Sequence, residues 1–381
     1  MEMQFIYADN AATTKMSDVA VKAMLPYLQE IYANPSSVHI LGQRSAAALF
    51  SARQQLAQLL NCAPKELFFT SGGSEADNQA LISAAAIGRQ QGKRHIISTA
   101  MEHHAILHTL EVLEEQGFTI TLLRPQKDGI VTAAQVAAAL TDATCLVSVM
   151  YANNETGAIQ PIKEIGALCR QRGVLFHTDA VQAAGHVDID VQRDNIDMLS
   201  LSAHKFHGPK GVGLLFAKGS IQLTSLIRGG GQERGKRAGT ENLPGIVGLA
   251  AALKDAQEQL AANTAYITNL RDSLRAGLEQ IPGASFNGNR EHCLPGTANY
   301  SFQGVNGEAL LSRLANAGIC CSSGSACSAG SLEPSHVLLA LGLSRDMAQG
   351  ALRFSLCAYN TMDEVQTIIN EVAEAVKHLR R

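Results

Sequence analysis

A lysine directly after a short apolar segment is the first candidate for chemistry in this sequence. Lys205 lies in the segment 202–211, just past the apolar residues 198–202 and with a histidine on either side of it. Partial burial lowers the pKa of a lysine, and its neutral amine can then form a Schiff base with a carbonyl compound. The alternative is an ordinary surface turn that carries Lys205 and Lys210, and the segment alone leaves both interpretations open.

An aspartate lies at the end of the apolar segment that precedes this one. Asp179 directly follows residues 174–178, which predict a buried strand. The carboxyl ends of parallel strands meet at one edge of a sheet, so Asp179 and Lys205 are expected to face the same crevice. An acidic partner there could keep the ring nitrogen of pyridoxal phosphate (PLP) protonated, as this cofactor requires to act as an electron sink. Asp179 could equally cap the helix expected after it.

Residues 70–75 connect a predicted strand to a predicted helix through two glycines and two serines. The free N–H groups and the positive dipole end of such a helix suit a phosphate group. The alternative is a plain helix cap, with Ser71 or Ser74 before the helix and Glu75 in its first turn. The glycine spacing matches neither the Rossmann nor the P-loop motif.

Two further side chains are candidates for the same site. His103 begins a predicted helix and could stack on a planar cofactor ring, although lone histidines are more often structural. Cys327 lies in the Ser/Gly/Ala-rich stretch 322–331, where small neighbours leave a thiol accessible and accessible thiolates are reactive. The sequence of this loop alone favours an incidental cysteine in a flexible connector.

Alternating strands and helices must position these side chains. Short apolar segments predict seven strands, at 67–70, 95–98, 119–123, 145–151, 174–178, 198–202 and 213–217. Helical patterns lie between many of them, as at 75–90, 105–115 and 163–172. This alternation predicts an α/β fold with a mostly parallel seven-stranded sheet between helices.

The pattern changes after residue 240. A long helical stretch, 243–280, leads into a predicted strand at 297–302, a helix at 307–317, the loop 322–331, a strand at 352–356 and a helix at 363–379. We expect a large domain over residues 15–256 and a smaller α+β domain built from residues 1–14 and 257–381, which would carry the Cys327 loop.

Charge and cysteine spacing exclude several classes of protein. The net charge is −3, and no basic patch indicates direct nucleic-acid binding. Residues 1–10 have no signal-peptide pattern, and no apolar run is long enough to span a membrane, so we expect a cytoplasmic protein. The eight cysteines form no CxxC pair, so we expect no metal site.

Taken together, these segments resemble the class-V aminotransferases among the fold-type I PLP-dependent transferases, and within them the cysteine desulfurases of the NifS/IscS type. The resemblance covers nearly the whole chain. It is carried by residues 7–14, 34–39, 70–78, 102–103, 153–157, 179, 205, 232–235, 327, 333–336 and 353–355.

The resemblance implies a role for each residue around the cofactor. Lys205 would hold PLP covalently, and His103 would stack on the ring and serve as a proton shuttle near neutral pH. Asp179 would pair with the ring nitrogen and Gln182 with the ring hydroxyl. Further cofactor contacts would come from Gly73, Ser74, Asn154, Ser202, His204 and, across the interface of a homodimer with shared sites, Thr240.

The resemblance also implies the reaction. Asn154 and Arg353 would bind the carboxylate of L-cysteine, because a guanidinium fork fits that group. Cys327 would take the sulfur as a persulfide, leaving L-alanine, and pass it to a protein acceptor for iron–sulfur cluster assembly or tRNA thiolation. The alternatives are selenocysteine lysis or another class-V aminotransferase reaction, and a non-enzymatic sulfur-relay scaffold.

Three cysteines depart from the family pattern. Cys357 stands where the family usually has glycine, which could alter a turn near the carboxylate site. Cys320 and Cys321 add thiols just ahead of the loop, and we expect both to be inert.

Overall fold

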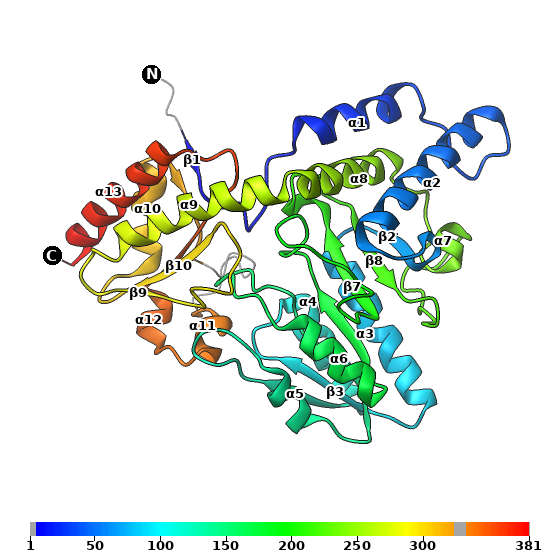
Figure 1. Cartoon of the computed structure of the whole chain (residues 1–381), viewed down its shortest axis with the longest axis horizontal. Coiled ribbons are helices and arrows are strands. Elements are labelled where there is room, and N and C mark those ends of the chain that lie inside the picture. The colour runs from blue at the N-terminus through cyan, green and yellow to red at the C-terminus, as the bar shows by residue number, and fades with distance from the viewer. Residues whose placement is uncertain (1–4, 324–332, 381) are drawn as a thin grey trace.

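The computed structural model describes residues 5–323 and 333–380 and contains a seven-stranded sheet (Figure 1). The strand order is β2-β8-β7-β6-β5-β3-β4. β8 is antiparallel to both of its neighbours, and the other adjacent pairs are parallel. The strands are β2 (Leu67–Thr70), β3 (His95–Thr99), β4 (Thr119–Leu123), β5 (Thr144–Ser148), β6 (Leu175–Asp179), β7 (Met198–Ser202) and β8 (Gly213–Ala217). The predicted α/β fold with a mostly parallel seven-stranded sheet is confirmed.

One strand is shorter than its apolar segment. The segment 145–151 predicted a single strand, but β5 ends at Ser148. Val149, Met150 and Tyr151 are nevertheless buried, so they are apolar because they pack in the core and not because they belong to the strand. Burial and strand pairing give the same sequence signal here.

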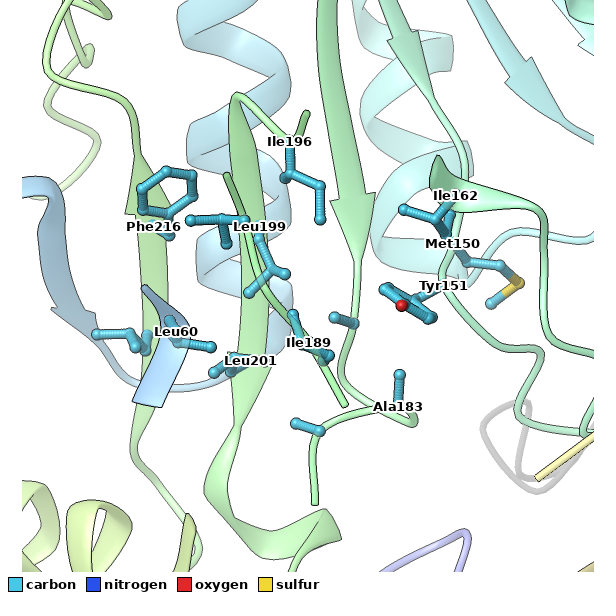
Figure 2. Packing of buried hydrophobic residues seen from close by; sticks show 14 of the residues in the cluster. Leu60, Met150, Tyr151, Ile162, Ala183, Ile189, Ile196, Leu199, Leu201 and Phe216 are labelled. Atoms are coloured by element: carbon cyan, nitrogen blue, oxygen red, sulfur yellow. The ribbon is translucent and has the colours of Figure 1, made fainter. Parts of the chain in front are cut away.

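Side chains alternate between two apolar cores along the strands, as the two-residue repeat of a strand requires. In β2, Phe68 packs in the core beneath α3 (Gly73–Gln90) and α4 (His104–Glu115). Its neighbour Phe69 belongs to the core of the opposite face, where Leu60, Leu199 and Phe216 also pack (Figure 2). That face is covered by α2 (Ile40–Leu60), α5 (Ala133–Ala139), α6 (Ile162–Arg172) and α8 (Leu243–Glu258).

Shorter elements complete this part of the chain. α1 (Asp18–Gln29) packs along α8 at its outer side (Figure 1). The others are the four-residue helix α7 (Gln232–Gly235) and two 3₁₀ turns, Pro64–Glu66 and Ala203–Lys205.

The long helical stretch 243–280 is two helices, which differs from the single element that the sequence indicates. α8 ends at Glu258, and α9 (Leu260–Leu278) follows after Gln259. Leu249 of α8 packs in the core of the seven-stranded sheet, whereas Leu274 of α9 packs in a second core. A division of the chain into domains near residue 256 stays our proposal.

The second core lies against a three-stranded antiparallel sheet of order β12-β10-β9. Its strands are β9 (Ala284–Phe286), β10 (Thr297–Phe302) and β12 (Ala351–Ser355). The N-terminal strand β1 (Ile6–Tyr7) pairs in parallel with β11 (Ile319–Cys320) beside it. The remaining helices are α10 (Gly307–Asn316), α11 (His336–Ala340), α12 (Arg345–Gln349) and α13 (Met362–Leu379).

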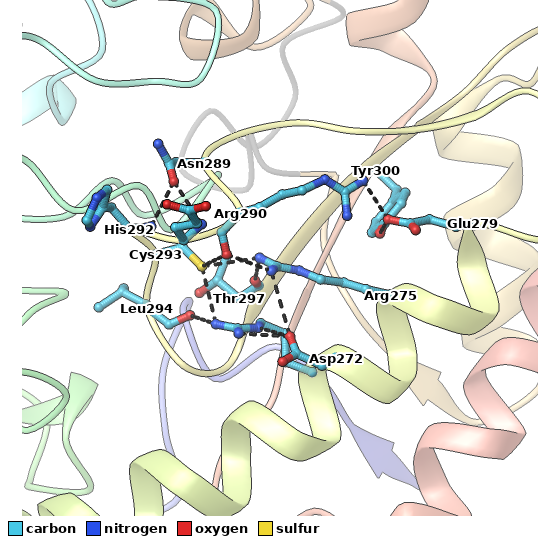
Figure 3. A network of polar contacts seen from close by, with 12 residues as sticks. Asp272, Arg275, Glu279, Asn289, Arg290, His292, Cys293, Leu294, Thr297 and Tyr300 are labelled. Carbon is cyan, nitrogen blue, oxygen red and sulfur yellow. Dashed lines mark hydrogen bonds and ion pairs between the residues drawn. The ribbon is translucent and has the colours of Figure 1, made fainter.

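A polar network joins the loop before β10 to α9. Arg271 Nη1 and Arg275 Nη2 donate to Cys293 Sγ at 3.2 and 3.3 Å (Figure 3). Cys293 also forms a backbone bridge with Ala158, which belongs to the larger part of the chain. Both guanidinium groups are buried, and the sulfur and nearby carbonyls accept from their terminal nitrogens, whereas Arg275 Nε has no partner among the described residues.

No helix in residues 5–323 and 333–380 is long and apolar enough to cross a membrane. The same residues contain no cluster of three or more His, Cys, Asp or Glu side chains that could hold a metal ion.

Candidate active site

A cavity of about 230 Å³ lies at the carboxyl ends of β5, β6 and β7. It brings together nine side chains singled out from the sequence: Ser74, His103, Asn154, Asp179, Gln182, Ser202, His204, Lys205 and Arg353. Six further lining residues were missed: Ala11, Ala12, Asp77, Met150, Ala152 and Val181.

Two described residues of the expected site do not line this cavity. Gly73 is buried at the start of α3, directly before Ser74. Thr240 is exposed in the segment after α7 and lies outside the cavity lining. Cys327 lies outside the described residues.

Lys205 reaches the cavity from the 3₁₀ turn that follows β7. Its Nζ donates to the backbone carbonyls of Ala11 and Ala12 at 2.7 and 2.8 Å. Gln182 Nε2 donates to the same Ala11 carbonyl at 2.8 Å. The N-terminal segment therefore holds two side chains that the sequence places far from it.

Asp179 is the last residue of β6 and is buried. Its Oδ1 accepts the backbone N–H of Val181 at 2.9 Å. Burial raises the pKa of Asp179 to about 6, and the Val181 N–H and Lys205 act in the opposite direction. Because this pKa lies below 7, the Asp179 carboxylate is predominantly ionised at neutral pH. The residues after Asp179 form turns rather than the helix expected for a capping role.

Asp77 is a second buried carboxyl beside Asp179. It lies on α3, is 1% exposed, and its Oδ1 has no hydrogen-bond partner among the described residues. Burial and the charge of Asp179 raise the pKa of Asp77 well above its ordinary value. A signal was present in the sequence, because Asp77 falls on the helix face that otherwise carries small residues such as Ala76, Ala80 and Ala84.

The start of α3 has the features of an anion site. Its N-cap residue, Gly72, makes no side-chain capping bond, and Ser74, Ser202 and His204 line the cavity beside it. A helix of this length presents free N–H groups and a positive dipole end at its first turn. A Cβ at Gly73 would lie 2.6 Å from Val181 Cγ2, so glycine allows the helix to begin this close to the cavity wall.

We expect Gly73→Ala to weaken cofactor binding by a steric effect. The added methyl clashes with Val181, and overpacking of about 1–3 kcal/mol corresponds to a Kd for PLP raised at least about fivefold. The double variant Gly73→Ala/Val181→Ala removes the clash and should recover most of the affinity relative to Val181→Ala alone. Titration of the apoprotein with PLP measures both, and equal affinities of Gly73→Ala and the unaltered protein would contradict the prediction.

His103 caps α4 and lines the cavity. Its Nδ1 accepts the Ala105 N–H at 3.1 Å. Burial, followed by the charge of Lys205, lowers the pKa of His103 to about 4. The sequence suggested a histidine that titrates near neutral pH, whereas the structure gives a neutral ring with its proton on Nε2. His103 is therefore suited to donating through Nε2.

Glu102 is fully buried next to His103. Its Oε1 accepts from the Thr99 hydroxyl at 2.7 Å and from the Met150 N–H at 2.9 Å. Its Oε2 has no partner among residues 5–323 and 333–380. Burial raises the pKa of Glu102 to about 8, so this side chain is mainly protonated at neutral pH.

The raised pKa of Glu102 predicts a pH-dependent effect on stability. Between the ordinary pKa of 4.5 and the folded value of about 8, the folded protein binds a proton that the unfolded chain has lost. The free energy of unfolding therefore falls as the pH rises through this window. Gln cannot ionise and so does not lose stability in this way. From pH 5 to pH 8, the free energy of unfolding of Glu102→Gln should therefore rise by about 1–3 kcal/mol relative to that of the unaltered protein.

Denaturant unfolding at both pH values measures this gain. Glu115→Gln, an exposed position on α4, serves as the matched control. Parallel pH profiles for Glu102→Gln and the unaltered protein would show that Glu102 is ionised in the folded state.

Arg353 extends from β12 into the cavity with a side chain only 3% exposed. Its Nη1 donates to the Asn154 carbonyl at 2.9 Å, so the two residues expected at a substrate carboxylate do meet. The Arg353 backbone also exchanges hydrogen bonds with Ser322, at 3.1 and 2.6 Å. The last described residues before the Cys327 segment are thus anchored beside Arg353.

The three unusual cysteines lie near this strand. Burial raises the pKa of Cys321 to about 12 and raises that of Cys357. Cys357 has a negative φ, so cysteine in place of glycine introduces no left-handed backbone strain. Its N–H donates to Asn360 Oδ1 at 2.9 Å. Thiols with raised pKa values are poor nucleophiles, which agrees with inert roles for these two.

Comparison with known proteins identifies the family. The family model "Aminotransferase class-V" matches residues 6–368. The chain belongs to this family. Class-V aminotransferases similar to this chain include "Cysteine desulfurase IscS" of Clostridium botulinum (strain Hall), 48% identical over 378 residues, which are 98% of this chain and 95% of the relative. "Cysteine desulfurase IscS" of Methanosarcina thermophila is 46% identical over 379 residues, covering 100% and 94%.

Solved structures agree with the sequence relatives. A protein described as "NIFS-LIKE PROTEIN" superposes with a TM-score of 0.93 at 37% identity, covering 99% of this chain and 100% of its own. A structure described as "SspA in complex with cysteine" gives a TM-score of 0.81 at 37% identity, covering 93% and 99%.

Class-V aminotransferases and cysteine desulfurases are in general PLP-dependent enzymes. The side chains of this cavity fit that cofactor. The uncapped start of α3 suits its phosphate, the ionised Asp179 suits a protonated ring nitrogen, and Lys205 lies in the same cavity.

Proposed function

We propose that this protein is a PLP-dependent cysteine desulfurase. It takes the sulfur of L-cysteine as a persulfide on Cys327 and releases L-alanine. The observation that carries the proposal is the meeting of Lys205, Asp179 and Arg353 in one cavity of a chain that is 48% identical to a cysteine desulfurase. These three residues supply an amine, a counter-charge and a carboxylate site for an amino-acid substrate.

The cofactor is held from both ends in this proposal. Lys205 would bind it covalently, Asp179 would hold its ring nitrogen in the protonated form, and His103 would stack on its ring. When bound, PLP supplies an electron sink that stabilises negative charge at the substrate Cα. The other contacts come from Gly73, Ser74, Asn154, Gln182, Ser202, His204 and, from the second subunit of a homodimer, Thr240.

Lys205 moves the proton at the substrate Cα. With PLP bound, the Lys205 amine would take this proton as a general base. The carbonyls of Ala11 and Ala12 lie within 2.8 Å of Nζ and can hold the resulting ammonium group. The neutral His103 lines the same cavity and can donate a hydrogen bond through Nε2.

Arg353 and Asn154 fix the substrate by its carboxylate. The Cys327 thiolate forms the new S–S bond while the Cβ–S bond of the substrate breaks. The electron pair of the broken bond stays with carbon, which takes a proton and leaves as alanine. The persulfide is then available to a protein acceptor, such as an iron–sulfur scaffold, in the cytoplasm.

Incubation of the purified, PLP-loaded protein with L-cysteine and a dithiol tests the proposal. We expect alanine and sulfide in equal amounts, with L-serine as a control that yields neither. Alanine and selenide from L-selenocysteine, without products from L-cysteine, would favour the selenocysteine lyase. A protein that shows no visible absorbance after PLP addition would favour a non-enzymatic scaffold.

A further inference from the structure

The guanidinium group of Arg353 is paired with a carboxylate of the protein itself. Arg353 Nη2 donates to Asp9 Oδ1 at 2.7 Å, and Arg353 Nη1 donates to the Asn154 carbonyl at 2.9 Å. The third guanidinium nitrogen, Nε, is buried and has no partner in residues 5–323 and 333–380. The guanidinium expected to bind the substrate carboxylate is therefore already bound to the carboxylate of Asp9.

The backbone fixes Asp9 in this position. Asp9 forms a bridge with Ser355, two residues along β12 from Arg353. The neighbouring Asn10 N–H donates to the Ser355 carbonyl at 3.2 Å, and the Asn10 side chain donates to the same carbonyl at 2.8 Å. The pairing with Arg353 thus follows from the way in which the N-terminal segment lies on β12.

The two members of the pair differ in their freedom to move. The Arg353 side chain is 3% exposed, and the Asp9 side chain is 21% exposed. A buried guanidinium without a counter-ion is strongly unfavourable, so Asp9 neutralises Arg353 before a substrate binds. One guanidinium cannot neutralise two carboxylates in a buried site, and of the two residues Asp9 has access to water.

We propose that Asp9 competes with the substrate carboxylate for Arg353. Asp9 must release Arg353 when an amino acid binds. Asp9 thereby keeps Arg353 neutralised between turnovers, weakens the binding of every ligand that has a carboxylate, and promotes the release of the product. This inference rests on the proposed function, because it takes Arg353 as the carboxylate site.

An Asp9 that competes for Arg353 and an Asp9 that only positions Arg353 have opposite effects on the affinity for carboxylate ligands. A competitor lowers the affinity of L-cysteine and L-alanine alike, since both carry the carboxylate. It leaves the affinity of 2-aminoethanethiol unchanged, because that amine has the thiol of cysteine and no carboxylate. A residue that merely orients Arg353 would instead increase carboxylate affinity.

Asp9→Asn in the PLP-loaded protein tests this. The amide keeps the size of the side chain and a hydrogen-bonding oxygen but removes the charge. We expect the KM for L-cysteine and the inhibition constant of L-alanine to fall together by about three- to tenfold, the scale of one partly exposed ion pair. The binding of 2-aminoethanethiol, followed by the visible absorbance of the cofactor, should not change. Asp142→Asn, an exposed position, is the matched control.

A higher KM for L-cysteine in Asp9→Asn would overturn the proposal in favour of positioning, and unchanged constants would overturn it as well. Asp9→Ser replaces Asp9→Asn if the latter does not fold. If the unaltered protein fails to turn over L-cysteine, the proposed function fails by itself. The binding of L-alanine to the two proteins then still decides the role of Asp9.

Discussion

Cys327→Ser is expected to lower the formation of alanine and sulfide from L-cysteine by at least about a thousandfold, as is typical when a covalent nucleophile is removed. A serine hydroxyl is not ionised at neutral pH and cannot form the S–S bond that holds the sulfur. The variant should still bind PLP and should still change its visible spectrum when L-cysteine is added, because Lys205, Asp179 and Arg353 are intact. Product assays and the absorbance spectrum separate the two stages.

Cys321→Ser is the matched control for this variant. Cys321 lies six residues earlier, and burial raises the pKa of its thiol to about 12. The Cys321→Ser protein should therefore form alanine and sulfide at the normal rate. Normal alanine production by Cys327→Ser would contradict a persulfide on Cys327 and would point to a lyase reaction on the same scaffold.

Lys205→Ala is expected to abolish turnover altogether, with a loss of at least about a thousandfold from proton transfer alone. The variant removes both the covalent attachment of PLP and the amine that moves the Cα proton. Unlike Cys327→Ser, it should fail at the first stage, so no Cα proton should exchange with solvent. Deuterium incorporation into L-alanine, followed by NMR, measures this stage without any sulfur transfer.

Lys210→Ala is the matched control, because Lys210 is exposed on the same segment and lines no part of the cavity. It should exchange the Cα proton at the normal rate. Added methylamine should restore part of the exchange in Lys205→Ala by supplying a small amine. Normal exchange in Lys205→Ala would assign the proton transfer to a different base.

The sheet and its edge were predictable because their signals are local. Four of the seven strands have the predicted bounds. Three of them, β2, β7 and β8, are buried throughout and are therefore short, continuous apolar segments, whereas β4 is a partly exposed edge strand. Asp179 ends β6 and Lys205 follows β7, the adjacent parallel strand, so the carboxyl-end rule places them at one crevice. The amine and the counter-charge were therefore predictable together from the sequence.

The remainder of the cavity depends on contacts between distant segments. Ala11 and Ala12 contribute backbone carbonyls, which no residue type reveals, and they meet Lys205 about 190 residues away in the chain. Asp9 meets Arg353 only because the N-terminal segment lies on β12. Asp77 was visible as a polar residue on a small-residue helix face, but a helical repeat alone does not show which cavity that face lines.

The division between α8 and α9 was missed for a different reason. Residues 243–280 are rich in helix-forming residues on both sides of Gln259, and neither glycine nor proline marks the junction. The two helices are distinguished by the core in which each one packs. Packing of this kind is a tertiary property.

Mass spectrometry of the protein after a single addition of L-cysteine tests the central claim most directly. The PLP-loaded protein is mixed with an equimolar amount of L-cysteine, alkylated and digested, and the peptides that contain each of the eight cysteines are compared. We predict one additional sulfur atom on Cys327, matched by one equivalent of alanine. Alanine formed without added sulfur on Cys327, or with the sulfur on Cys320, Cys321 or Cys357, would contradict the account.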